Sequence, residues 1–275
     1  MDDQLSLLVV GAHPDDCSIK AGGIAAKYVD AGHHVTFLSV TDGRAGHHTM
    51  EPEELATRRY GETQQVADTL GVDYTVFDIP DGELTTAIEY RERLIRFIRE
   101  RDPDLILGPR PNDYHPDHRA TGTLLIDAAY LLIVPHVCPD TPALTDVPVF
   151  GYVQDGFAKP APFEPNVVLD VSDVEGKKLA ALDCHESQVY EWLPYTWGCL
   201  DAVPDSTDAR REWLATEGLS YFNANGSTNV ANRFRGALEE RYGSVATQIT
   251  HAEAVEFSEF GAEPDETVID RLFFW

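Results

Sequence analysis

Near its start the chain carries the apolar run Leu5–Val10 (LSLLVV), followed at once by the polar loop Gly11–Asp16 (GAHPDD). A short, continuous apolar run is typical of a strand that is buried on both faces of a parallel sheet. Pro14 has a fixed backbone φ and keeps the preceding residue, His13, extended, so the loop is stiff. A histidine and two aspartates therefore lie beyond the carboxyl end of a buried strand, where ligands bind in open α/β sheets.

Strand-like and helix-like stretches alternate through the first half of the chain, which indicates a parallel sheet covered on both faces. The expected strands lie at 5–10, 34–40, 74–79 and 104–107, and the expected helices at about 17–31, 53–70, 86–101 and 116–132. This alternation predicts a Rossmann-like, doubly wound α/β fold with a mainly parallel sheet of strand order about 3-2-1-4-5.

The pattern loosens after Pro135, where prolines interrupt the chain repeatedly. Further strands are expected at 147–153 and 166–171, and helices at 174–185 and 230–242. We predict a single domain over residues 1–275. Its Rossmann-like core covers 1–135, and 136–275 adds strands, loops and a C-terminal helix as a smaller layer.

The charge is strongly one-sided: among 275 residues, 47 acids oppose 21 bases, and the formal net charge is -26. Such a surface repels nucleic acid and anionic membranes, so neither is an expected partner. Because the acids are spread along the whole chain, adaptation to a salty cytoplasm explains them better than a solubility device or attraction of a cationic substrate. The N-terminus is acidic, unlike a signal peptide, and no apolar run approaches the roughly 20 residues of a membrane span, so we expect a cytoplasmic protein.

A second polar cluster, Asn112–His118 (NDYHPDH), follows the fourth expected strand. Strands one and four are neighbours in a 3-2-1-4 sheet, so the two loops should meet at one crevice. His13, one of the two adjacent aspartates and His118 would form a His₂-carboxylate set. Three such ligands leave a coordination position open, as in catalytic zinc sites. Capping of the following helices would explain either motif alone equally well, but it does not explain their joint placement.

These residues resemble the signature of the LmbE/PIG-L family of zinc-dependent N-deacetylases. The resemblance rests on AHPDD at 12–16 and HPDH at 115–118, and it continues at 59–62, 70–72, 178–181 and 185–188, and weakly at 252–254. One departure is Cys17, which stands where the first motif more often has glutamate. That position is not a metal ligand in the family, so the resemblance predicts that the chemistry is retained.

The resemblance implies a role for each residue of the two loops. His13, Asp16 and His118 would hold Zn²⁺, and the choice of Asp16 over Asp15 comes from the family rather than from spacing. Asp15 would be the general base. His115 would stabilise the oxyanion and protonate the leaving amine, and Asp117 would orient His115 and raise its pKa.

Substrate contacts are expected from Arg59, with its neighbour Arg58 as the alternative. Asp42 and Arg44 follow the second strand on the same side of the sheet and would line the cleft. His185 would either contact the substrate or tie down the C-terminal layer. Trp192 and Trp197 would either form an aromatic wall or serve ordinary packing.

The expected reaction is hydrolysis of an N-acyl amide, N-acetyl above all, on a small sugar-like substrate. An amidase acting on a non-sugar or thiol-conjugate amide is the alternative, and a non-catalytic metal-binding protein is a weaker one. A nucleotide-binding Rossmann protein is disfavoured, because GAHPDD replaces the GxGxxG loop and places two negative charges where phosphates would bind. A His₂-carboxylate site could also take iron, cobalt or manganese. Homo-oligomers are common in the family, so a homo-oligomer is possible here.

Overall fold

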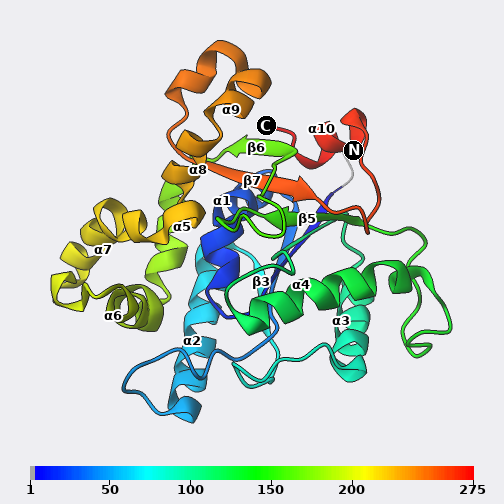
Figure 1. Ribbon diagram of the computed structural model, residues 1–275, viewed down its shortest axis with the longest axis horizontal. Helices are drawn as coiled ribbons and strands as arrows, with labels where there is room; N and C mark the ends of the chain where they lie inside the picture. The colour runs from blue at the N-terminus through cyan, green and yellow to red at the C-terminus, as the bar shows by residue number, and fades with distance from the viewer. Residues whose placement is uncertain (1–3) are drawn as a thin grey trace.

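The computed structural model describes residues 4–275, apart from the side chains of residues 223 and 224. Its centre is a seven-stranded sheet of order β3-β2-β1-β4-β5-β7-β6 (Figure 1). The predicted order 3-2-1-4-5 is thereby confirmed, and β7 and β6 extend it. The strands are β1 (Ser6–Gly11), β2 (His34–Ser39), β3 (Asp73–Val76), β4 (Leu105–Gly108), β5 (Val149–Val153), β6 (Val167–Asp170) and β7 (Ala252–Phe257).

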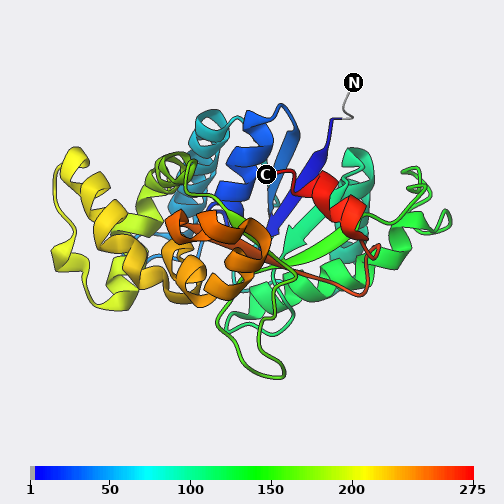
Figure 2. The same cartoon turned by 90° about the horizontal axis from the view of Figure 1, so that it is seen from above.

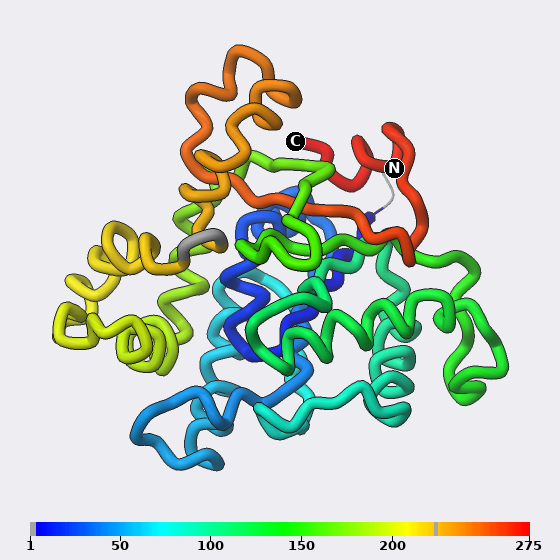
Figure 3. Tube along the Cα trace, viewed as in Figure 1, coloured from blue at the N-terminus to red at the C-terminus, as the bar shows by residue number. Residues whose placement is uncertain are grey.

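The first five strands pair in parallel, and β7 runs antiparallel to both β5 and β6. In the tube of Figure 3, β5 and β7 lie side by side although about a hundred residues separate them along the chain. The antiparallel strands belong to the second half, so both halves of the chain contribute to one sheet.

Alternate residues of the central strands face two different hydrophobic cores. In β1, Leu7 and Val9 face the core that includes α1 and α2, whereas Leu8 and Val10 face the core that includes α3 and α4. Figure 2 shows helices on both sides of the sheet. These helices are α1 (Asp16–Asp30), α2 (Pro52–Leu70), α3 (Ile88–Arg101) and α4 (Pro116–Ala129).

The second half adds short helices around one end and one edge of the sheet (Figure 1). They are α5 (Glu175–Asp183), a π-helix η2 (Ser187–Trp192), α6 (Leu193–Trp197), α7 (Thr207–Thr216), the 3₁₀ segment η4 (Gly218–Asn225), α8 (Ser227–Arg233), α9 (Arg235–Tyr242) and α10 (Glu266–Leu272). None of the helices within residues 4–275 has the length and apolar character needed to span a membrane.

Three of the differences from the expectations bear on the site and on the sheet. The third strand ends at Val76 rather than at 79, which leaves residues 77–81 as a loop. The single helix expected at 230–242 is two helices that meet at Phe234. The strand β7 was not expected, because its sequence AEAVEF carries a glutamate, Glu253, on a buried position.

Candidate active site

The two polar loops meet at the carboxyl ends of β1 and β4, the neighbouring strands at the centre of the sheet. His13 Nδ1 lies 3.1 Å from His118 Nε2. Asp16 Oδ2 lies 3.6 Å from His13 Nδ1 and 3.4 Å from His118 Nε2. These three atoms form a triangle with nearly equal sides.

The size of the triangle can be tested against a metal ion. Zinc in proteins binds nitrogen and oxygen ligands at about 2.0–2.2 Å, so two ligands of a tetrahedral ion lie about 3.3–3.6 Å apart. The separations of 3.1–3.6 Å agree with that geometry. Two imidazoles and one carboxylate also suit zinc chemically, so the residues present fit the ion. Ligand atoms of His13, His115 and His118 likewise lie within 4.8 Å of one another, as do those of His13, Asp81 and Asp117, so further donors surround the same ring.

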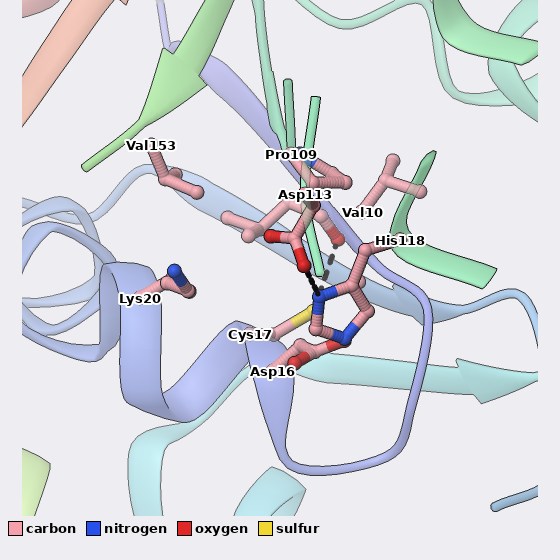
Figure 4. A pocket seen from close by; sticks show the side chains of 10 residues that line it. Val10, Asp16, Cys17, Lys20, Pro109, Asp113, His118 and Val153 are labelled. Carbon is pink, nitrogen blue, oxygen red and sulfur yellow. Dashed lines mark hydrogen bonds and ion pairs between the residues drawn. The ribbon is translucent and has the colours of Figure 1, made fainter. Parts of the chain in front are cut away.

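A carboxylate lies behind each histidine of the triangle. Asp81 Oδ1 is 3.0 Å from His13 Nε2, and Asp113 Oδ1 is 3.0 Å from His118 Nδ1, as the dashed line in Figure 4 marks. Such contacts determine the tautomer and the ring orientation of a metal-binding histidine. Both rings therefore turn their remaining nitrogen towards Asp16.

The pKa values of the Asp81 and Asp113 carboxyls reflect their contacts with the two histidines. Burial raises the pKa of the Asp81 carboxyl, but its hydrogen bond with His13 and the charge of that ring outweigh burial and lower the pKa to about 2. Burial likewise opposes ionisation of Asp113, and the contact with His118 lowers its pKa nonetheless. Both carboxylates are thus ionised at neutral pH.

Asp81 was missed by the sequence reasoning, although a signal was present. It follows the third strand in the turn Ile79–Gly82 (IPDG), the same combination of strand, proline and aspartate as in the first loop. Its backbone N–H donates to Asp42 Oδ1 (3.3 Å), and its Oδ2 accepts from the backbone N–H of Ala45 (3.2 Å). Three strand ends, not two, therefore contribute to the cluster.

Asp15, the neighbour of Asp16, lines the same cleft and forms an ion pair with Arg59. Arg59 Nη2 donates to Asp15 Oδ1 at 2.6 Å, and Arg59 Nη1 donates to the carbonyl of Gly43 at 3.0 Å. Arg59 is only 2% exposed, so its charge acts on Asp15 in a largely dry setting. The alternative cation, Arg58, lies elsewhere and binds Glu191 through two hydrogen bonds.

The arrangement of His115 and Asp117 corrects the expectation. His115 Nδ1 accepts a hydrogen bond from the backbone N–H of Asp117 as the N-cap of α4, so the carboxylate of Asp117 does not hold this ring. That carboxylate instead accepts from the backbone N–H of Gly82 (2.6 Å) and lies 3.6 Å from His13 Nε2. Burial, followed by the charges of the imidazoles His13 and His118, lowers the pKa of His115. The charge of Asp117 raises that pKa, as expected, but it is outweighed.

Asp42 and Arg44, expected to line the cleft, are placed differently, and His185 takes the second of its two expected roles. Arg44 binds Asp42 (2.7 Å) and Glu53 (2.6 Å), and neither Asp42 nor Arg44 belongs to the described lining of the cleft. They brace the loop that holds Asp81. His185 is 0% exposed and contacts Ser18 Oγ on α1 at 3.0 Å, so it ties the C-terminal layer to the core and does not contact a substrate.

A cleft with about 670 Å³ accessible to water lies over the cluster. On one side it is bounded by Tyr114 and Phe157, from the loops that follow β4 and β5. On the other side it is bounded by the segment 192–197 and by residues of η4. Trp192 and Trp197 both line the cleft, which favours the aromatic-wall interpretation over simple packing. This volume is typical of a site for a small-molecule substrate.

A Rossmann-like sheet with a three-ligand donor set and an open cleft at its central strand ends defines a class, the metal-dependent enzymes. The comparison with known proteins narrows that class. The sequence profile of the PIG-L family, described as GlcNAc-PI de-N-acetylase, matches residues 8–129. The diacetylchitobiose deacetylase of Thermococcus kodakarensis is 34% identical over 213 residues, which cover 70% of this chain and 76% of that protein. The chain belongs to the PIG-L/LmbE family, whose deacetylases depend on zinc.

Two further relatives show the range of this fold. The 4-oxalmesaconate hydratase of Pseudomonas putida is 26% identical over 238 residues, covering 84% of this chain and 91% of the hydratase. The crystal structure of the N,N'-diacetylchitobiose deacetylase of Pyrococcus horikoshii, in complex with an inhibitor, superposes with a TM-score of 0.68 at 24% identity. It covers 94% of this chain and 85% of that protein, and at this identity it supports the fold alone.

Proposed function

We propose that the protein is a zinc-dependent N-deacetylase that hydrolyses the N-acetyl amide of an amino-sugar substrate. The observation that carries this proposal is the pairing of two arrangements in one cleft. The triangle of His13, Asp16 and His118 has the dimensions of a zinc site, and the Asp15–Arg59 ion pair lies beside it. A protein that only binds a metal ion would need the ligand triangle alone. Hydrolysis also needs a base, and the Asp15 carboxylate of the ion pair can serve as one.

Each residue has a role that its contacts suggest. Bound zinc would supply Lewis acidity, which polarises the amide carbonyl and acidifies water. Asp15 is assigned as the general base. Arg59 engages its Oδ1, and no hydrogen bond among the described residues engages its Oδ2, so that oxygen is left to accept a proton from the attacking water.

His115 is assigned as the donor to the developing oxyanion. Its Nδ1 accepts from the backbone, so the neutral ring carries its proton on Nε2, and the lowered pKa favours this neutral form. The proton that Asp15 takes from water is then the one delivered to the leaving amine, which replaces the expected delivery from His115. Three further carboxylates act indirectly. Asp81 and Asp113 hold the two zinc-binding rings, and Asp117 holds the loop around Gly82.

Deacetylation is tested by measuring zinc content and amine release on the same preparation. Purified protein is assayed with N-acetylglucosamine and N,N'-diacetylchitobiose, with and without a chelator, beside His118→Ala. We expect about one zinc per chain, release of equal amounts of amine and acetate, and loss of both zinc and activity in the variant. Full amine release from zinc-free protein would refute the proposal.

The hydratase relative makes hydration the second candidate reaction. Its substrate, 4-oxalmesaconate, contains a conjugated double bond, and hydration of that bond would reduce the ultraviolet absorbance without releasing an amine. The same preparation is therefore offered 4-oxalmesaconate. A loss of absorbance, together with no amine release from either acetylated sugar, would show that the protein catalyses hydration instead.

A further inference from the structure

A small cavity adjoins the cleft beside the metal-binding cluster. About 20 Å³ of it is accessible to water, and its lining shares Asp16, Lys20, Asp113 and His118 with that of the cleft. The rest of its lining consists of valine, glycine, cysteine and proline residues, so these four supply its strongly polar side chains. Figure 4 shows Lys20 on one side of the cavity and Asp113 with His118 on the other. Because one water molecule needs about 10–15 Å³ of such volume, the cavity has room for a single water.

Lys20 lines this cavity with one donor to spare. Its Nζ donates to the carbonyl of Gln154 at 3.0 Å and to Asn225 Oδ1 at 2.7 Å. Both of these acceptors are neutral. A lysine ammonium has three N–H groups, so one of them remains for a further acceptor.

Asp113 lines the same cavity with one oxygen to spare. Its Oδ1 accepts from the backbone N–H of His115 and contacts His118 Nδ1, both at 3.0 Å. Within the part of the chain that the structure describes, no hydrogen bond engages its Oδ2. Asp113 therefore holds the zinc-binding ring of His118 with one oxygen and leaves the other for a donor in the cavity.

Lys20 and Asp113 act on each other although they are too far apart for a direct ion pair. Among residues 4–275, no carboxylate oxygen lies within 4.0 Å of Lys20 Nζ. Burial lowers the pKa of Lys20, and the charge of Asp113 is the largest of the effects that oppose burial. The charge of Lys20 in turn helps to lower the pKa of Asp113. A water molecule can bridge polar groups across such a gap at a small cost in entropy.

We propose that one buried water in this cavity accepts a hydrogen bond from Lys20 Nζ and donates one to Asp113 Oδ2, which makes Lys20 a positioning residue of the zinc site. Asp16, which lines the same cavity, is the acceptor for the second O–H of the water, so the water has the two to four polar partners that a buried water needs. The contacts then run from Lys20 through the water and Asp113 to His118.

The consequence of this bridge concerns metal affinity. Partners that orient a metal-binding histidine contribute to the affinity of the site, and here the ammonium stabilises the carboxylate that orients His118. The inference rests on the zinc site of the proposed deacetylase and goes beyond it, because Lys20 contacts neither the ion nor the substrate in this role.

Zinc affinity, measured by competition with a chelator of known affinity, tests the role of Lys20. Lys20→Met should raise the zinc Kd by about 10-fold or more, as the loss of such partners does. Lys27→Met removes a lysine of the same helix that pairs with Asp173 outside the cavity, and it should leave the Kd unchanged. Because Lys20 acts through Asp113, Lys20→Met should change the Kd by no more than about twofold in an Asp113→Asn background.

A merely structural lysine gives a different result. If Lys20 serves only to tie α1 to Gln154 and Asn225, Lys20→Met will lower the free energy of unfolding and leave the zinc Kd unchanged, and the proposal is overturned. Full additivity with Asp113→Asn overturns it as well. Co²⁺ in place of zinc gives a spectroscopic readout, because its visible absorption follows the geometry of its ligands. The spectrum should change in Lys20→Met and stay the same in Lys27→Met, and an unchanged spectrum in Lys20→Met counts against the proposal.

A crystal structure of the zinc-free wild-type protein tests the water itself and needs no folded variant. We expect one ordered water within hydrogen-bond distance of Lys20 Nζ and Asp113 Oδ2. A structure without that water, or with the two groups in direct contact, overturns the proposal. The two proposals can fail separately. A protein that holds this water and binds zinc in a Lys20-dependent way but releases no amine counts against deacetylation alone. An active deacetylase whose Lys20→Met variant keeps the wild-type zinc Kd counts against the role of Lys20 alone.

Discussion

Two adjacent aspartates have different surroundings, and their difference decides the chemistry of the site. Asp16 accepts hydrogen bonds from the backbone N–H groups of Ala12 and His13, both at 2.9 Å, and completes the ligand triangle. Asp15 turns to Arg59. Consecutive residues in a stiff turn point in different directions, so one dipeptide can supply both a ligand and a base.

A matched pair of substitutions tests this division. Asp15→Asn should keep its zinc and lose about 10²- to 10⁴-fold in kcat, which is the usual contribution of a general base. Asp16→Asn should lose zinc affinity. Metal analysis and steady-state kinetics on both variants measure these effects. The two assignments would be reversed if Asp16→Asn kept its zinc and Asp15→Asn lost it.

His185 should make the stability of the protein depend on pH. Complete burial lowers its pKa to about 4, against about 6.5 in an unfolded chain. Between these values the unfolded state binds more protons, so stability falls as the pH falls from about 6.5 towards 4. The loss between pH 7 and pH 5 is about 2 kcal/mol.

Urea unfolding at pH 7 and pH 5 measures this loss, with His185→Gln as the control. All other ionisable groups are the same in both proteins, so the difference between their pH dependences isolates His185. An identical pH dependence in the two proteins would show that His185 does not remain neutral in the fold.

At the scale of the element, α1 is interrupted beside the site. Ala21 departs from helical geometry (φ −140°, ψ 20°), and the backbone N–H groups of Gly23 and Ile24 are bound by Glu253 of β7 at 2.9 and 2.8 Å. Lys178 of α5 neutralises that carboxylate at 2.7 Å, and both partners are buried. Glu253 thus replaces the missing helical acceptors and joins α1, α5 and β7.

Glu253→Ala should therefore destabilise the fold by about 3–5 kcal/mol, because it leaves a buried ammonium and two N–H groups without their acceptor. Denaturant unfolding measures the change. Lys177→Ala, which breaks an exposed ion pair with Asp30, should cost no more than about 1 kcal/mol. Equal effects of the two substitutions would show that the interruption of α1 is satisfied in another way.

For the whole molecule, the net charge of -26 predicts a stability that depends on salt. Repulsion among the acids opposes the compact state, and the screening length shrinks from about 10 Å at 0.1 M salt to about 3 Å at 1 M. We expect the melting temperature to rise steadily with KCl from 0.1 to 2 M. Calorimetry measures it, and an equally osmotic sorbitol series is the control. A melting temperature that is independent of KCl would count against adaptation to high salt.

The fold was predictable because its signals are local. Apolar runs such as Leu5–Val10, each followed by a helical stretch, indicate a parallel sheet, and the observed order of the first five strands agrees. The strand β7 was not predictable in this way, since Glu253 is buried only because Lys178 and two helical N–H groups come to it from elsewhere in the chain. A buried charge does not show in the local pattern.

By itself, the amino-acid sequence determined which polar residues follow the central strands, and so where on the sheet a site would form and which ligands it could offer. Only the tertiary structure decided what each side chain contacts: Asp81 on His13, Arg59 on Asp15, His185 buried against Ser18 and Lys20 facing the cleft. The physical reason is that position along a strand or helix depends on nearby residues. The direction, burial and charge partners of a side chain depend on elements that folding brings in from distant parts of the chain.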